Sequence, residues 1–291
     1  MKYIFAILIG AALFGCSDER AESGPVSGSL AVAVLPDQSI EALNARHGPL
    51  IDYLEKTTSF DIELVIPLDY ADLLDKFDNG SINLAWFGGV TFTQAEARSQ
   101  ADPLVLRDID LEFTSCYLTS ASENRSTIRE FEGEDFAFGP ELSTSGHLMP
   151  RYFLEGQGLY AEQFFASTRH TAGHDQTARL VSDGIIELGV ANCVIVQSLL
   201  ENNVLDPGDV RIIETTPPYS DYVWATNASM HEQTRALLLD AFLALDASDP
   251  QHRAILRSQG ANAYMPAASG DFTLVRKAVR LHGLQTDSGE R

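Results

Sequence analysis

The sequence predicts an α/β fold of two lobes with a ligand cleft between them. Short apolar strands alternate with amphipathic helices in a first group before about residue 113, which favours a parallel sheet covered by helices. A second group of such units fills residues 114–221, and the tail after it is helical with no sheet of its own. We expect the tail to return to the first lobe, so that crossover strands join the lobes and ligand binds beyond the strand ends.

Each lobe is assigned from the spacing of its apolar residues. The first lobe is expected to comprise residues 29–113 plus 222–291, and the second residues 114–221. Strands are predicted at 29–36, 62–67, 82–87, 113–119, 136–138, 185–196 (largely strand), 210–214 and 222–225. Helices are predicted at 40–56, 70–77, 91–98, 148–154, 177–182, 234–245, 253–258 and 272–282.

The charge of the chain argues against a nucleic-acid partner. Its 291 residues carry a formal net charge of −21, which repels a polyanion. An acidic protein that binds a small anion needs hydrogen-bond donors placed at the site itself, because its overall field is unfavourable.

The N-terminus resembles a bacterial lipoprotein signal. Lys2 precedes an apolar run at 3–14 that is too short to span a bilayer, and the run ends at Gly15-Cys16. In this interpretation residues 1–16 are a signal peptide ending at the lipobox, Cys16 is lipidated, and 17–28 is a flexible tether. The alternative is an ordinary signal peptide with an incidental cysteine, and both predict export to the periplasm or cell envelope.

Two further cysteines, Cys116 and Cys193, fall in apolar stretches. In an oxidising compartment they could form a disulfide, whereas buried free thiols are also common in such surroundings. The sequence leaves both open.

The loop Ser143-Thr144-Ser145-Gly146 is the strongest candidate for an anion site. It follows a predicted strand and opens a predicted helix, where free N–H groups and a positive partial charge favour anions. Three hydroxyls add donors, and glycine permits close approach of the backbone. Simple N-capping by serine or threonine is the alternative explanation.

Three further candidates are His174, the backbone at Phe87 and Gly88, and Tyr70, of which the last two lie at or just after the ends of predicted strands. His174 could donate to an oxyanion, although a histidine beside Asp175 is more often structural. The N–H groups around Phe87 and Gly88 could face a ligand, or could form only a turn. Tyr70 could place a phenol at the cleft or lie on the surface.

Signatures of enzymes, metal sites and cofactor sites are scarce. The chain has no G-x-S-x-G, Walker A, H-E-x-x-H or C-x-x-C motif. His147, His170 and His174 show no spacing typical of a metal site. A hydrolase triad of Ser143, His174 and Asp175 is poor, because an adjacent aspartate cannot easily orient the histidine.

Several stretches together resemble the phosphonate-binding (PhnD-like) periplasmic proteins of ABC transporters, and most closely their branch labelled selenate-binding. The resemblance runs from about residue 30 to 284. It is carried by Asp69-Tyr70-Ala71, Leu84-Ala85-Trp86-Phe87-Gly88-Gly89, the stretch from Ser143 to Leu154, Gly173-His174-Asp175 and the stretch from Thr215 to Tyr222.

The resemblance implies a type 2 periplasmic-binding fold whose two lobes close on the ligand, with no enzymatic activity. It implies oxyanion contacts from Tyr70, Ser143, Thr144, Ser145 and His174, with an aspartate at Asp221. A small oxyanion ligand, an ABC permease in the membrane and a monomeric state follow from the same resemblance.

The sequence departs from the aminoalkylphosphonate binders of this family. An acid that meets the ligand amine is replaced here by Val194, and an aromatic residue is replaced near Ser115-Cys116. These losses fit a smaller inorganic oxyanion better, such as selenate, phosphite, phosphate or a sulfate-like species. The ligand class expected from the resemblance as a whole is a small oxyanion of the phosphonate, phosphite, phosphate or selenate type. Asp221 would repel a full dianion unless it is protonated or paired, whereas a ligand with its own proton could donate to it.

The leading interpretation is therefore an extracytoplasmic solute-binding protein of an ABC importer. One rival is a sensory protein that presents an oxyanion to a histidine kinase, or presents arsenite held by Cys116 and Cys193. The other is a small-ester hydrolase, which the poor triad disfavours.

Overall fold

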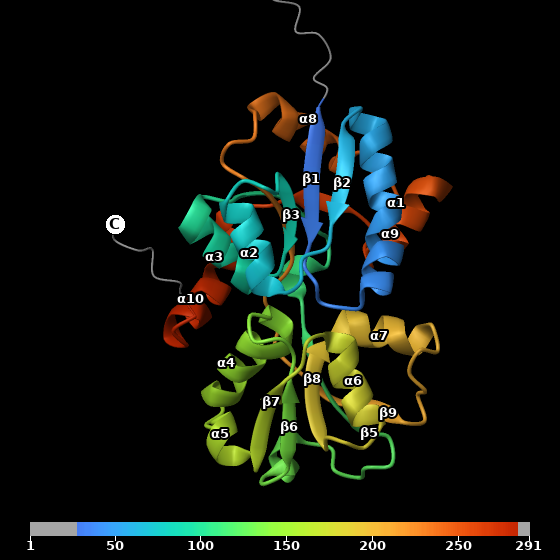
Figure 1. The fold of residues 1–291 in the computed structure, drawn as a ribbon. Helices are drawn as coiled ribbons and strands as arrows, with labels where there is room; N and C mark the ends of the chain where they lie inside the picture. The colour runs from blue at the N-terminus through green and yellow to red at the C-terminus, as the bar shows by residue number, and fades with distance from the viewer. Residues whose placement is uncertain (1–27, 285–291) are drawn as a thin grey trace, which may run out of the picture.

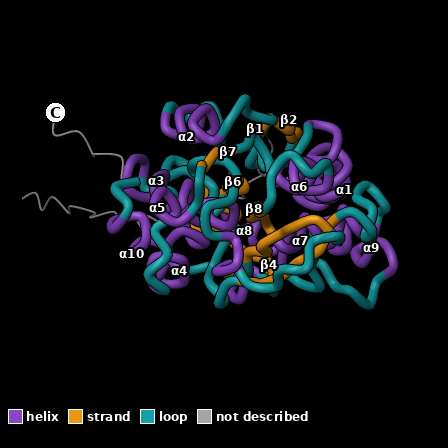
Figure 2. The backbone as a smooth tube through the Cα atoms, turned by 90° about the horizontal axis from the view of Figure 1, so that it is seen from below, coloured by secondary structure: helices purple, strands orange, loops and turns teal. Residues whose placement is uncertain are grey.

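A computed structural model describes residues 28–284, and the predicted lipobox with Cys16 lies outside that range. The described residues form two lobes, one above the other in Figure 1, each with a mixed sheet and helices around it. Figure 2, seen from below, shows helices at the periphery and strands between them. None of the helices within residues 28–284 is both long and apolar enough to span a membrane.

The first lobe contains a six-stranded sheet in the spatial order β11-β4-β10-β3-β1-β2. β1 pairs in parallel with β2 and β3, whereas β10 is antiparallel to β3 and β4, and β11 is antiparallel to β4. The strands are β1 (Ser29–Val34), β2 (Asp61–Val65), β3 (Leu84–Phe87), β4 (Asp102–Arg107), β10 (Val223–Thr226) and β11 (Tyr264–Pro266). The helices are α1 (Ile40–Thr58), α2 (Tyr70–Asp78), α3 (Gly89–Ser99), α8 (Glu232–Leu243), α9 (Pro250–Ser258) and α10 (Thr273–Leu281).

The second lobe contains a five-stranded sheet in the order β7-β6-β8-β5-β9. β6 is parallel to β7 and β8, and β5 is antiparallel to β8 and β9. The strands are β5 (Ser115–Ser120), β6 (Asp135–Phe138), β7 (Ser167–His170), β8 (Leu188–Asn192) and β9 (Val210–Thr215). The helices are α4 (Met149–Gly156), α5 (Ala161–Phe164), α6 (His174–Ser182) and α7 (Cys193–Glu201).

The two sheets differ in part from the parallel arrangement that the βα rhythm predicts. β10 follows the second lobe in the sequence. It runs antiparallel to β3 and β4 and lies between them, in the middle of the first sheet. The alternation of strands and helices reveals parallel neighbours within one continuous segment, but it does not reveal a strand inserted from elsewhere. The mixed α/β class itself is confirmed.

The prediction that residues 185–196 are largely strand is wrong for the second half of this stretch, which is helical. The strand ends at Asn192, whose side-chain oxygen accepts the Ile195 N–H at 3.1 Å and so caps α7. β-Branched residues such as Val194 favour strands, but a capping asparagine followed by an apolar helical face overrides that preference.

Two crossing segments join the lobes and pair with each other. The first runs from β4 to β5 and the second from β9 to β10. Phe113 and Tyr219 exchange both backbone hydrogen bonds, at 2.8 and 3.0 Å, and the Asp221 N–H donates to the Asp110 carbonyl at 2.9 Å. The lobe boundaries at 113/114 and 221/222 remain our proposal, since the paired stretch spans them.

The side chains of Cys116 and Cys193 form a disulfide across 77 residues of chain. It ties β5 to the first residue of α7, beside the Asn192 cap. The bond removes the free thiols that the arsenite alternative requires.

We predict that Cys116→Ala/Cys193→Ala lowers the free energy of unfolding by about 2–5 kcal/mol, because closing a loop of this length restricts the unfolded chain. Urea unfolding with and without reductant measures this. Reductant should bring the wild-type midpoint down to that of the double variant and leave the variant unchanged. A wild-type midpoint that reductant does not move would contradict the stabilising role.

Candidate ligand-binding site

The strands of the two sheets bring polar loops together where the lobes meet. β1 and β2 point from the upper lobe toward the lower one in Figure 1, so the residues after them face the second lobe. The candidate site combines Tyr70 and Gly88 of the first lobe with Ser143, Ser145 and His174 of the second.

Ser143 follows β6 and caps a π-helical turn at Thr144–Leu148 that leads into α4. Its Oγ accepts the Gly146 N–H at 2.9 Å, which is the capping role that the sequence left open. A Cβ on Gly146 would lie 2.9 Å from both Gly139 Cα and His174 Cε1. Glycine at 146 therefore lets the loop pack against β6 and His174.

Thr144 reaches from the second lobe to the first. Its Oγ1 accepts the Val90 N–H at 2.9 Å, at the start of α3. A Cβ on Gly88 would lie 3.3 Å from this oxygen and 3.5 Å from Asp221 Oδ1. Gly88 thus permits the close approach of the lobes, and it brings the Thr144 hydroxyl close to Asp221.

His174 is fully buried at the first turn of α6, and its hydrogen bonds define its tautomer. Nδ1 accepts the Asn192 N–H at 3.2 Å, so the ring proton sits on Nε2, which lies 3.4 Å from Ser143 Oγ. Burial lowers the pKa of His174 to about 4, so the ring is neutral. His174 therefore offers one neutral N–H donor toward Ser143.

Tyr70 and Ser145 present hydroxyls that are buried without a hydrogen-bond partner among residues 28–284. Burial raises the pKa of Tyr70 well above its usual range, so the phenol remains a donor. Unpartnered buried polar atoms are uncommon in native proteins, because each costs about 1–3 kcal/mol. Tyr70 belongs to the first lobe and Ser145 to the second, so each lobe holds one such hydroxyl.

Asp221 lies in the second crossing segment and contacts both lobes. Its Oδ1 accepts the Gly89 N–H at 2.9 Å, whereas Oδ2 is buried without a partner in the described chain. Burial raises the pKa of Asp221 to about 7, although the Gly89 N–H and the nearby Thr144 and Ser145 hydroxyls oppose the rise. The Gly89 contact leaves Oδ2 as the oxygen that takes up the proton.

One site residue escaped the sequence analysis. Asp37 follows β1, is 1% exposed, and accepts the Tyr222 O–H at 2.7 Å. No motif surrounds it, because Tyr222 lies 185 residues further along the chain.

Phe87 does not present its side chain to the site. It is fully buried and packs edge-to-face on Phe77, with ring centroids 5.0 Å apart, in the core of the first lobe. Any contact of Phe87 with a ligand is therefore limited to its backbone.

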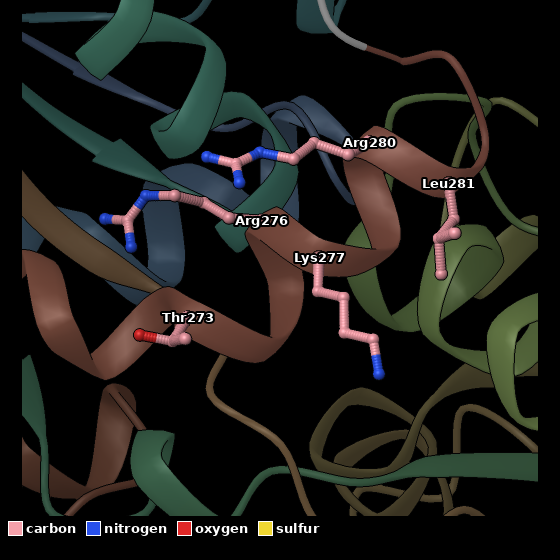
Figure 3. A pocket seen from close by; sticks show the side chains of 5 residues that line it. All are labelled: Thr273, Arg276, Lys277, Arg280 and Leu281. Atoms are coloured by element: carbon pink, nitrogen blue, oxygen red, sulfur yellow. The ribbon is translucent and has the colours of Figure 1, made fainter.

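A pocket of about 410 Å³ lies elsewhere, on the surface of α10. It is lined by Thr273, Arg276, Lys277, Arg280 and Leu281 (Figure 3). The side chains of Arg276 and Arg280 extend away from that of Lys277, and Arg276 is already bound to Glu96. These cations do not converge on one point, so the α10 pocket lacks the grouped donors that would hold a small anion.

The described residues contain no group of three or more metal-ligating side chains. The triad geometry is also poor, since Asn192 rather than Asp175 occupies Nδ1 of His174, and Asp175 accepts the Gln176 N–H.

Comparison with known proteins places the chain in a family. Residues 32–272 match the family model described as ABC transporter, phosphonate, periplasmic substrate-binding protein. The chain belongs to this family. Its members are binding proteins of transporters and not enzymes.

Two relatives illustrate the similarity. A probable ABC transporter phosphite binding protein, PhnD1 of Prochlorococcus marinus, is 28% identical over 86% of this chain and 89% of its own length. The phosphate-import protein PhnD of Mycolicibacterium smegmatis is 26% identical over 69% of this chain and 67% of its own.

Solved structures support the fold. PhnD1 of Prochlorococcus marinus in complex with methylphosphonate gives a TM-score of 0.83 at 26% identity, covering 88% of this chain and 98% of that one. A phosphonate-transporter binding protein of Pseudomonas aeruginosa gives 0.79 at 14% identity, covering 88% and 87%. The type 2 periplasmic-binding fold is thereby confirmed.

We predict that Asp221→Asn changes how the stability of the unliganded protein depends on pH. The folded-state pKa of about 7 exceeds the ordinary 3.8, so between these values the folded state binds the extra proton. Wild-type stability therefore falls as pH rises across this window, and the variant lacks that loss.

Between pH 5 and 8, the free energy of unfolding of the variant should rise by about 2 kcal/mol relative to that of the wild type. Denaturant unfolding at several pH values measures this, with Asp52→Asn on the exposed face of α1 as the matched control. A parallel pH dependence of Asp221→Asn and wild type would show that the carboxyl ionises freely.

Proposed function

We propose that this protein is the extracytoplasmic solute-binding component of an ABC importer and binds a small oxyanion by closure of its two lobes. The observation that carries the proposal is that each lobe holds a buried hydroxyl without a hydrogen-bond partner among residues 28–284, Tyr70 Oη in the first and Ser145 Oγ in the second, and that both residues lie near Asp221. A tetrahedral oxyanion between the lobes would accept hydrogen bonds from both, and from His174 Nε2.

The donors suit an anion although the chain is strongly acidic. All of them are neutral hydroxyls and an uncharged imidazole, held by the capping turn at Ser143 and by the Asn192 N–H. Neutral donors fixed in place stabilise an anion in a dry site without the desolvation cost of an ion pair.

Lobe closure is supported by hydrogen bonds that connect the lobes directly. The Val90 N–H donates to Thr144 Oγ1 at 2.9 Å, and the His174 N–H donates to the Asp37 carbonyl at 3.1 Å. Both bonds join loops that would separate if the lobes rotated about the paired crossing segments.

The ligand proposed is of the phosphonate, phosphite or phosphate type, without an amine. Val194 faces the first lobe, since a Cβ on Gly260 would lie 3.1 Å from its Cγ1, and it supplies no acceptor for an ammonium group. Asp221 Oδ2 favours a ligand that carries its own proton, whereas selenate offers none and requires the carboxyl itself to be protonated.

The remaining parts of the proposal rest on the family and on the N-terminal sequence. They are docking of the closed form on a permease, a monomeric state, and lipid anchoring through Cys16. Presentation of the same ligand to a histidine kinase would use the same site, but no contact in the described chain favours it.

We predict that the protein binds methylphosphonate, phosphite or phosphate, and that Tyr70→Phe and Ser145→Ala each weaken binding about 10- to 100-fold, because each loses a hydrogen bond to a charged ligand. Isothermal titration with these anions, selenate and sulfate measures it. Tyr160→Phe and Ser122→Ala, which lose surface hydroxyls, are the matched controls.

Saturation at about 100 times the Kd should also raise the free energy of unfolding by about 2.7 kcal/mol. Binding that is equally strong in Tyr70→Phe, Ser145→Ala and wild type would move the ligand away from the interlobe site. No binding of any of these anions would refute the proposed ligand class.

We further predict that ligand reduces the radius of gyration measured by small-angle X-ray scattering, because the free lobes open about the crossing segments. Thr144→Val removes the hydroxyl that accepts the Val90 N–H and should weaken this compaction at equal saturation. An identical radius with and without ligand would contradict closure.

A further inference from the structure

One carboxylate oxygen of Asp37 has no hydrogen-bond partner among the residues that the structure describes. The residue follows β1 and precedes Ser39, the cap of α1. Its Oδ2 accepts the Tyr222 O–H, but its Oδ1 is buried without a hydrogen-bond partner in residues 28–284. A buried carboxylate oxygen without a partner costs several kcal/mol unless something else supplies a donor.

The position of Asp37 is fixed from both lobes. Its carbonyl accepts the His174 N–H, from the helix that also carries the donor Nε2. Gly173 makes this contact possible, since a Cβ there would lie 3.2 Å from the Asp37 carbonyl oxygen. Asp37 therefore lies beside His174 in the arrangement that we assign to the ligand.

The orientation of the carboxylate is fixed by a chain of hydrogen bonds. Asn192 Nδ2 donates to the Tyr222 hydroxyl at 2.9 Å, and Tyr222 donates to Asp37 Oδ2 at 2.7 Å. The backbone N–H of the same Asn192 binds His174 Nδ1. One residue of the second lobe thus sets both the histidine donor and, through Tyr222, the carboxylate acceptor.

Tyr70 lies near the Asp37 carboxyl group. The charge of Asp37 contributes, after burial, to the raised pKa of Tyr70, so the two groups are close. Within residues 28–284 neither Tyr70 Oη nor Asp37 Oδ1 has a hydrogen-bond partner, so they are not bonded to each other. A ligand hydroxyl that reached both could accept from the phenol and donate to the carboxylate.

Nearby groups offset part of the cost of burying a negative charge on Asp37. Burial raises its pKa, while Arg46 of α1 and the Tyr222 hydroxyl oppose the rise. Arg107 lowers it by less than Arg46 does, and Arg107 is itself bound to Asp110.

We propose that Asp37 is a specificity-determining residue of the ligand site, whose free Oδ1 accepts a hydrogen bond from a hydroxyl of a protonated oxyanion. The site would then favour ligands with a P–OH group over sulfate-type anions, which carry no proton. This inference rests on the proposed oxyanion function and adds a second acceptor to Asp221.

The test is Asp37→Asn, titrated with methylphosphonate and with sulfate in mildly acidic buffer, where only the phosphonate carries a hydroxyl. The amide oxygen can still accept from Tyr222, but the amide nitrogen replaces the acceptor with a donor. The ratio of the sulfate Kd to the methylphosphonate Kd should fall at least about tenfold.

Two matched variants separate specificity from structure. Tyr222→Phe keeps the carboxylate and removes only the hydrogen bond that orients it, so the ratio should fall less than it does in Asp37→Asn. Glu41→Gln, on the exposed side of α1, controls for the loss of one negative charge and should change neither Kd.

Other results would overturn the inference. Equal weakening of both ligands by Asp37→Asn would mean that Asp37 has only a structural role, as the acceptor of the Tyr222 hydroxyl. Selective loss of 2-aminoethylphosphonate alone would assign the oxygen to an amine and not to a hydroxyl. If the wild-type protein binds none of these anions, the proposed function fails and this inference fails with it.

Discussion

Arg107 and Asp110 form an ion pair that is completely enclosed at the start of the first crossing segment. Nη2 of the guanidinium binds Oδ1 of the carboxylate at 2.6 Å, and Nη1 donates to the Gln259 carbonyl at 2.6 Å. The guanidinium carbon Cζ lies over the rings of Trp86 and Tyr222, 4.9 and 5.2 Å from their centroids. Removing two charges from water costs several kcal/mol per ion, and here hydrogen bonds and aromatic contacts offset that cost.

The geometry of the site depends on this pair. The Asp110 carbonyl accepts the Asp221 N–H, so the backbone that the pair holds also positions the acid of the second crossing segment. Tyr222, under the guanidinium, stacks on Trp86 with centroids 5.0 Å apart and donates to Asp37. Both carboxylates of the proposed site are therefore positioned through one buried ion pair in the first lobe, although the donors come mainly from the second lobe.

An oxyanion at the proposed site would meet neutral donors, although the chain as a whole is strongly acidic. His174 is kept neutral by burial and by the Asn192 N–H. The two buried carboxyl groups, Asp37 and Asp221, have raised pKa values that reduce their repulsion. Selectivity would then come from proton positions more than from net attraction.

The parts of the fold that follow from local sequence were predictable. The first three strands and helices follow apolar periodicity, and the capping turn at Ser143 has a local signature of hydroxyls and glycine. The α/β class and the family resemblance were confirmed from such local stretches.

The remainder depends on contacts between distant residues. β11 is three residues long, ends in Pro266, and exists only because β4 pairs with it. Asp37 joins the site through Tyr222, His174 and Asn192, which no spacing connects to it. The disulfide likewise depends on β5 and α7 lying side by side, which the incorrect strand at 185–196 obscured.

The insertion of β10 between β3 and β4 has a consequence for biogenesis. Every strand of the second sheet lies within one continuous stretch that also contains both disulfide cysteines, so this lobe can mature without later residues. The first sheet cannot be completed in the same way, because β10 lies between β3 and β4. Those two strands have no partner on their facing edges until residues 223–226 are available. A chain that emerges from its N-terminal end would expose two unpaired strand edges throughout that interval, and such edges favour aggregation. The first lobe is thus the first to emerge and the last to complete its sheet. It is the lobe for which a periplasmic chaperone would matter most.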